Sequence, residues 1–141
     1  MQPVSQTLVE SIRAPIDQVF ALLTDPGRIA EWLPGCDAVE NSGPLAVGVR
    51  FTAHFGARLT EFEVVDYAPP RTVAWLERGA RKGWQTSYLL EAVAGATAVT
   101  ITGTWTPESE DAWLRGRTFA RRRVQSHLKA IMENLRNLLT A

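Results

Sequence analysis

A change of periodicity near residue 106 divides the chain into two kinds of structure. Between residues 36 and 105, β-branched and aromatic residues recur in runs of about six to ten, which is typical of strands. After residue 106, apolar residues recur at helical spacing to about Leu139, which predicts one long helix. The strand runs are separated by turn-forming residues at Asn41-Ser42-Gly43-Pro44, Gly56-Ala57, Ala68-Pro69-Pro70, residues 79–82 and Ala94-Gly95. These breaks delimit about six strands, and the short connections favour antiparallel neighbours.

The N-terminal segment adds one strand and two short helices. Residues 4–12 alternate as a strand does, and residues 16–23 place apolar side chains at helical spacing. Asp25-Pro26 supplies a cap and a first-turn proline, and Pro34-Gly35 ends that second helix. The order of elements predicts an α+β fold in which a curved antiparallel sheet of about seven strands wraps around the C-terminal helix. Without an internal repeat or linker, residues 1–141 are expected to form a single domain.

The final helix has an apolar side and a basic side. On a helical wheel the apolar side gathers Trp113, Ala120, Val124, Leu128, Ile131, Leu135 and Leu138, and the opposite side carries Arg122, Lys129 and Arg136. We expect the apolar side to cover the sheet. The excess of basic residues after residue 112 fits a solvated helix surface better than a nucleic-acid site.

The composition excludes several classes of protein. The 15 Lys and Arg residues balance the 15 Asp and Glu residues, so nucleic acid is not an expected partner. The single cysteine, Cys36, cannot form an intramolecular disulfide, and no Cys/His spacing suits a metal, so no metal or other cofactor is predicted. No segment approaches the roughly 20 apolar residues that span a bilayer, and the N-terminus lacks a signal-peptide pattern. We therefore expect a cytoplasmic protein without a membrane span.

Four segments carry a family resemblance. They are Ser11-Ile12-Arg13-Ala14-Pro15-Ile16-Asp17-Gln18-Val19-Phe20, Leu23-Thr24-Asp25-Pro26 with Trp32-Leu33-Pro34, Val64-Val65-Asp66-Tyr67-Ala68-Pro69-Pro70-Arg71, and the C-terminal helix. In the order and spacing of these segments the chain resembles the START/Bet v1-like helix-grip superfamily, and within it the bacterial polyketide cyclase/dehydrase-like group often called SRPBCC. The resemblance implies an apolar cavity between the sheet and the C-terminal helix. It also implies binding of lipids, hormones or polyketides, with a minority of members catalysing cyclisation or dehydration.

Pro34-Gly35-Cys36 is similar to a tripeptide found in a subgroup associated with carbon monoxide dehydrogenase maturation. The glycine-rich later segments of that subgroup do not occur in this chain. A lone cysteine is most often a small buried apolar residue, so Cys36 is expected in the core rather than as a nucleophile or ligand.

Alternation along the strands predicts which side chains enter the cavity. Placing the aromatic and branched members of each strand inward brings several rings together around the helix. The predicted ligand-binding residues are Glu10, Phe51, Phe55, Arg58, Phe62, Trp75, Trp84, Tyr88, Trp105 and Arg117. A stripe of rings on one sheet face is commonly ordinary core, and that alternative stays open beside an apolar pocket with indole and phenol donors.

Glu10 is predicted to face the apolar interior, where an unpaired carboxylate costs several kcal/mol. We therefore expect it to lie within hydrogen-bonding reach of Arg58, Arg117 or a tyrosine hydroxyl. Three interpretations remain for Glu10: a ligand anchor, a general acid whose pKa burial raises, or a structural ion pair. A bulge in the first strand would instead turn Glu10 toward solvent.

No catalytic constellation is recognisable in the sequence. His54 is expected on the convex face and His127 at the edge of the apolar side of the helix, and neither has a companion at triad or metal spacing. The leading hypothesis is binding of a small hydrophobic ligand that is polyketide-, lipid- or aromatic-like. The alternatives are a polyketide cyclase or dehydratase that uses the same cavity, and a protein-interaction or maturation factor. A monomer and a homodimer are both compatible with the sequence.

Overall fold

The computed structural model describes residues 3–41, 43–78, 84–106 and 110–140, and within the last segment it describes side chains from residue 121 onward. In chain order its elements are β1 (Val4–Ile12), α1 (Ile16–Thr24), the 3-10 turn η1 (Pro26–Arg28), α2 (Ile29–Trp32), β2 (Ala38–Glu40), β3 (Arg50–Phe55), β4 (Arg58–Ala68), β5 (Thr72–Arg78), β6 (Trp84–Val93), β7 (Ala96–Trp105) and α3 (Glu110–Thr140).

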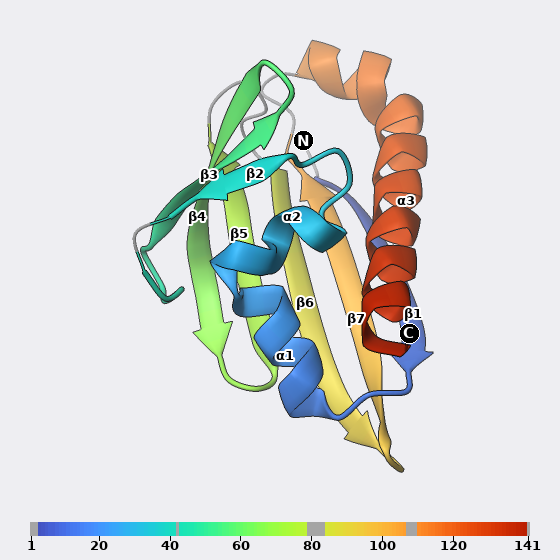
Figure 1. The fold of residues 1–141 in the computed structure, drawn as a ribbon. Coiled ribbons are helices and arrows are strands. Elements are labelled where there is room, and N and C mark those ends of the chain that lie inside the picture. Colours follow the sequence, from blue (N-terminus) through green and yellow to red (C-terminus); the bar gives the residue numbers. More distant parts are fainter. Residues whose placement is uncertain (1–2, 42, 79–83, 107–109, 141) are drawn as a thin grey trace.

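One sheet and the helices on one of its faces form two layers (Figure 1). Within the described residues, seven strands pair antiparallel in the order β1-β7-β6-β5-β4-β3-β2. The sheet is therefore a meander from β2 to β7, with β1 added beside β7. α1, α2 and α3 cover the same face, and α3 packs mainly on β1 and β7. The predicted α+β fold, with a sheet that curves around a long C-terminal helix, is confirmed.

Tight turns keep the alternation of side chains intact across most of the sheet. Ala94 and Gly95 join β6 to β7 with φ values of 46° and 84°, and a two-residue turn with positive φ at both positions matches the twist of the two strands it joins. The β6–β7 pairing then runs without a break from Val93↔Ala96 to Trp84↔Trp105. Among the described strand pairs, the register shifts only in β4, between Val64 and Asp66, where a bulge bends the strand.

Two local predictions need correction. β2 has three residues rather than the six or more that the sequence pattern suggested, and it forms the outer edge of the sheet, where short strands limit unwanted pairing. The second short helix is divided into η1 and α2. η1 begins at a proline and forms one tight 3-10 turn. α2 has four residues, so it adds about one further turn.

The core lies between the sheet and the helices. As predicted, α3 contributes the buried side chains Val124, Leu128, Ile131 and Leu135, and it also contributes Met132, which the helical wheel did not assign. Gly103 of β7 permits the close approach of this helix, because a Cβ atom at that position would lie 2.8 Å from Val124 Cγ1. None of the described helices is long and apolar enough to cross a membrane.

Candidate functional site

A cavity of about 530 Å³ lies between the sheet and α3. Its volume is in the range of pockets that enclose a drug-sized molecule. Strands β3 to β7, the segment after α2, and the middle of α3 all contribute to its wall. The described residues that line it are Leu33, Pro34, Phe55, Arg58, Phe62, Trp75, Glu77, Trp84, Thr86, Gly103, Arg122, Arg123, Val124, Ser126, His127, Leu128 and Ala130.

The inner wall of the cavity is an extension of the aromatic core. Trp75 lines the cavity and is 1% exposed. Its ring lies 5.9 Å from Trp32, 5.2 Å from Tyr88 and 5.4 Å from Phe51, measured between centroids. Phe51 in turn stacks on Phe62 at 5.2 Å. Because packed rings hold one another in offset and edge-to-face arrangements, this wall is rigid.

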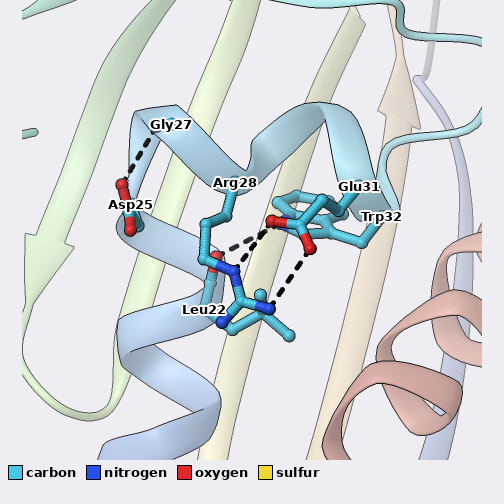
Figure 2. Close-up of polar contacts among 6 residues, drawn as sticks. All are labelled: Leu22, Asp25, Gly27, Arg28, Glu31 and Trp32. Atoms are coloured by element: carbon cyan, nitrogen blue, oxygen red, sulfur yellow. Dashed lines mark hydrogen bonds and ion pairs between the residues drawn. The ribbon is translucent and has the colours of Figure 1, made fainter.

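Contacts around α2 hold Trp32 under that wall (Figure 2). Asp25 Oδ1 accepts a hydrogen bond from the Gly27 amide at 3.0 Å and caps η1. Arg28 Nε donates to Glu31 Oε2 at 2.8 Å across the outer side of the same turn, a hydrogen bond that lowers the pKa of Glu31 and raises that of Arg28. On the inner side, Trp32 Nε1 donates to the Leu22 carbonyl at 3.2 Å.

α3 fixes the other end of this short helix. Asn134 Nδ2 donates to the Trp32 carbonyl at 3.0 Å. Leu33 and Pro34, which follow α2 directly, are thereby placed against the cavity. The short helices thus serve to position one wall of the site.

The polar groups of the cavity come from both layers. From the sheet, Arg58 lies over the Phe55 ring, with its guanidinium carbon 5.0 Å from the ring centroid, and Glu77 and Thr86 lie farther along neighbouring strands. α3 contributes Arg122, Arg123, Ser126 and His127. The cavity therefore combines aromatic walls with several charged or hydrogen-bonding side chains.

Five of the ten predicted site residues line the cavity. They are Phe55, Arg58, Phe62, Trp75 and Trp84. Phe51 and Tyr88 face the same side of the sheet but are fully buried behind Trp75, within the core. Trp105 lies beside Trp84, with 6.5 Å between ring centroids, and is not part of the lining.

The Tyr88 hydroxyl is buried without a hydrogen-bond partner in the described part of the chain. Complete burial raises the pKa of Tyr88 far above its ordinary value, because the phenolate form would be desolvated. The hydroxyl therefore stays protonated and retains its ability to donate.

The prediction of the partner of Glu10 was wrong. Its carboxylate pairs with Arg136 of α3, Oε1 to Nη2, at 2.6 Å, and the same nitrogen donates to the Ser11 carbonyl at 3.1 Å. Glu10 does share a sheet face with the buried Ile12, as alternation predicted. β1 is an edge strand, however, so its side chain emerges beside α3 rather than beneath it and is 33% exposed.

Two further residues of α3 correct the helical wheel. Arg136, expected opposite the apolar side, reaches back to Glu10 because its long side chain can fold along the helix surface. Arg122, also expected on that opposite side, lines the cavity. Where a cavity separates the helix from the sheet, residues flanking the apolar stripe border open space, and a wheel cannot show this. The side chain of Arg117 lies outside the described residues.

Sequence reasoning did not predict most of the α3 residues that line the cavity. Arg122, Ser126 and Ala130 recur every four residues, as do Arg123 and His127, so these residues form two adjacent rows along the helix, on one side of the buried Val124 and Leu128. That spacing was visible in the sequence. The position of the cavity along the helix, which makes those rows significant, was not.

Neither a metal site nor a reactive thiol is evident in the part of the chain that the structure describes. There, no group of three or more His, Cys, Asp or Glu side chains is arranged to hold an ion. Cys36 is buried, as predicted, and its Sγ donates to the Ala38 carbonyl at 3.4 Å. Burial raises the pKa of the Cys36 thiol, which suppresses its nucleophilic form.

Comparison with protein families gives one match that spans nearly the whole chain. The family described as polyketide cyclase / dehydrase and lipid transport matches residues 3–140. None of the curated proteins compared with the chain matches it.

Solved structures share the fold at low sequence identity. DynU16, a protein in the dynemicin biosynthetic locus, aligns with a TM-score of 0.70 and 21% identity over 98% of this chain, which spans 48% of the length of DynU16. The Aha1 dimer from Colwellia psychrerythraea aligns with a TM-score of 0.68 and 22% identity, over 99% of this chain and 96% of that one. Ara h 8.0201 aligns with a TM-score of 0.70 and 13% identity, over 95% and 98% of the two chains.

Proposed function

The chain belongs to the polyketide cyclase/dehydrase and lipid transport family, and we propose that it binds a small hydrophobic molecule in the cavity between the sheet and α3. The observation that carries this proposal is the aromatic lining, in which Phe55, Phe62, Trp75 and Trp84 face one space of about 530 Å³. Water beside these rings has few hydrogen-bonding partners, so its replacement by an apolar or aromatic molecule is favourable.

The rigidity of the wall supports binding of a planar or extended ligand. Trp75 is held by Trp32, Phe51 and Tyr88 on its inner side, so the ring does not have to be ordered when a ligand arrives. A preorganised wall loses little conformational entropy on binding, which leaves more of the burial energy for affinity.

A neutral apolar dye, N-phenyl-1-naphthylamine, tests this proposal by its fluorescence. The dye is expected to bind the wild-type chain saturably, in a one-to-one complex. Thr86→Phe, which fills part of the cavity, is expected to abolish binding. Ser87→Phe is the matched control, because Ser87 is the next residue of β6 and its side chain points to the opposite face of the sheet.

The dye experiment has clear adverse outcomes. Absence of saturable binding to the folded wild type, judged by circular dichroism and a cooperative unfolding transition, would exclude the proposed function for ligands of this class. Equal loss of binding in Thr86→Phe and Ser87→Phe would place the dye elsewhere on the molecule.

A second candidate function is catalysis of cyclisation or dehydration in the same cavity. The observation that favours it is the presence in the lining of Glu77 and His127, two side chains of the types that commonly transfer protons. One such group would remove a proton from a carbon between two carbonyls, the carbanion would add to another carbonyl of the same chain, and the alkoxide would recover the proton.

Turnover distinguishes catalysis from binding. A poly-β-ketone thioester mimic is expected to give cyclised product, followed by mass spectrometry and ultraviolet absorbance, faster with the protein than in buffer. His127→Gln and Glu77→Gln then assign the proton-transfer group, provided that each variant still binds the neutral dye. A rate equal to the buffer rate, with the mimic bound, leaves the protein a binding module.

A further inference from the structure

We propose that the ligand is an amphipathic acid, with its apolar body inside the cavity and a terminal anionic group bound between Arg58 and Arg122. This inference rests on the proposed function and names the class of ligand. It follows from the charges at the cavity, from the contact of Arg58 with the Phe55 ring, and from the contrast between the exposed arginines and the buried apolar lining.

Two of the three arginines at the cavity, Arg58 and Arg122, differ from the arginines that form ion pairs across the sheet and between the sheet and α3. Arg50 and Arg78 pair with glutamates of β4, and Arg136 pairs with Glu10. In the described part of the chain, Arg58 and Arg122 have no carboxylate partner, although both are exposed. Their positive charges are thus available to an anion that enters from solvent.

Arg58 is preorganised for this role. It begins β4, directly across the hairpin from Phe55 in the β3–β4 register. Its guanidinium lies over the Phe55 ring, 5.0 Å from the centroid, and both residues line the cavity. Stacking on a ring restricts the long side chain while leaving the donor edges of the guanidinium open for a carboxylate or phosphate.

Arg122 supplies a second cation from the other layer. It lies in the first half of α3, and this helix begins at the end of the sheet that carries the β3–β4 hairpin (Figure 1). Two arginines from separate elements can bind one anion with charge-assisted hydrogen bonds, which are stronger than neutral ones. Glu77 and Arg123 also line the cavity, but each already has an interaction partner and neither is needed for this proposal.

The gradient from charged rim to apolar interior fixes the orientation of the ligand. Arg58 and Arg122 are exposed, whereas Phe62, Trp75, Val124 and Leu128 are buried. An anion among these buried side chains would face mainly rings and methyl groups, which cannot compensate its lost hydration. The acidic group therefore remains at the rim, and the hydrocarbon part enters first.

Matched ligands test the proposal by displacement of N-phenyl-1-naphthylamine. Decanoic acid and decanol share a chain length and differ in charge, and decyl phosphate separates a carboxylate from a phosphate as the preferred anion. The acid is expected to bind the wild type about tenfold more tightly than the alcohol at low salt. That preference should shrink as ionic strength rises, because exposed charges are screened.

Charge-removing variants locate the anion. Arg58→Gln and Arg122→Gln are each expected to reduce the preference for acid over alcohol severalfold, with the affinity for decanol unchanged. Arg121→Gln is the control, since Arg121 is the adjacent exposed residue of α3 and does not line the cavity. A preference that persists in the double variant Arg58→Gln/Arg122→Gln would overturn the proposed anion site.

The binding results distinguish failure of the proposed anion site from failure of the proposed hydrophobic ligand binding. Equal binding of decanoic acid and decanol to the wild type refutes the anion site and leaves a hydrophobic binding site intact. Failure of both ligands to displace the dye, or failure of the dye to bind at all, instead contradicts the proposed function.

Discussion

Two buried hydroxyl groups, those of Thr97 and Tyr88, differ in whether a hydrogen-bond partner is present among the described residues. Thr97 Oγ1 donates to the Ala14 carbonyl at 2.7 Å and is fully buried. The hydroxyl of Tyr88 has no partner among the described residues. Removing a buried donor that is paired leaves its acceptor unsatisfied, whereas removing one that is unpaired relieves a desolvation cost.

We therefore expect Tyr88→Phe to leave the free energy of unfolding unchanged or to raise it, and Thr97→Val to lower it by about 1–3 kcal/mol. Urea unfolding followed by circular dichroism measures both. A loss of stability in Tyr88→Phe as large as that in Thr97→Val would mean that the tyrosine hydroxyl has a strong partner, such as a bound water.

Cys36 provides a pH-dependent test of burial. Because desolvation raises the pKa of its thiol, the folded protein is expected to react with iodoacetamide more slowly than the urea-unfolded chain at the same pH. The midpoint of the rate profile should lie above the ordinary cysteine value of about 8.5.

The sign of the linked effect on stability follows from the same shift. Below the unfolded pKa of Cys36 both states hold the proton, and the contribution of the thiol to stability is fully present. As pH rises above that value the unfolded chain ionises first, so this contribution is lost. A rate midpoint below about 8.5 would instead require a nearby cation that activates the thiol.

Alternation and helical periodicity predicted the elements well because they depend on local geometry. The predicted inward positions of β3, β5 and β6 are buried or line the cavity, and so are those of β7 except Trp105, as expected from a side-chain period of two. The bulge in β4 comes after Val64, so it leaves the inward positions that precede it unchanged. The partner of Glu10 was not predictable in this way, because it depends on how far α3 lies from the sheet edge.

Gly103 controls the contact between β7 and α3. Its missing side chain lets the helix approach, since a Cβ atom would lie 2.8 Å from Val124 Cγ1 and 3.5 Å from Leu128 Cδ2. Gly103→Ala is therefore expected to destabilise the protein by about 1–3 kcal/mol, as overpacked cores do. Because Gly103 also borders the cavity, the same variant should weaken dye binding.

Gly43→Ala is the control for this substitution. A Cβ atom at Gly43 would meet nothing within 4 Å. The free energy of unfolding of Gly43→Ala should therefore differ from that of the wild type by less than about 0.5 kcal/mol. Unfolding transitions and dye titrations of both variants give the comparison. Wild-type stability in Gly103→Ala would show that α3 moves away from β7 without cost.

The cavity as a whole is a property that no single segment of the sequence contains. Which inward residues face open space, such as Trp84, and which are packed into the core, such as Tyr88, depends on the curvature of the sheet and on the path of α3. The family resemblance implied that a cavity exists. Its position along α3, and hence the place of Arg122 and His127 in its lining, required the assembled fold.

Ligand binding in the cavity would also stabilise the whole molecule. A ligand makes dispersion contacts with the side chains that border the cavity. A molecule that binds only the folded state raises the free energy of unfolding by about 2.7 kcal/mol at one hundred times its dissociation constant. We therefore expect the urea midpoint of the wild type to rise saturably with decanoic acid.

The order of stability of the wild type and the cavity-filling variant Thr86→Phe should reverse when ligand is added. Without ligand the variant is expected to equal or exceed the wild type by up to about 1 kcal/mol, because the added ring replaces missing contacts. With saturating ligand it should be the less stable protein, because it cannot bind. A wild-type midpoint that does not respond to ligand, or a variant that responds as strongly as the wild type, would contradict a cavity that couples binding to folding.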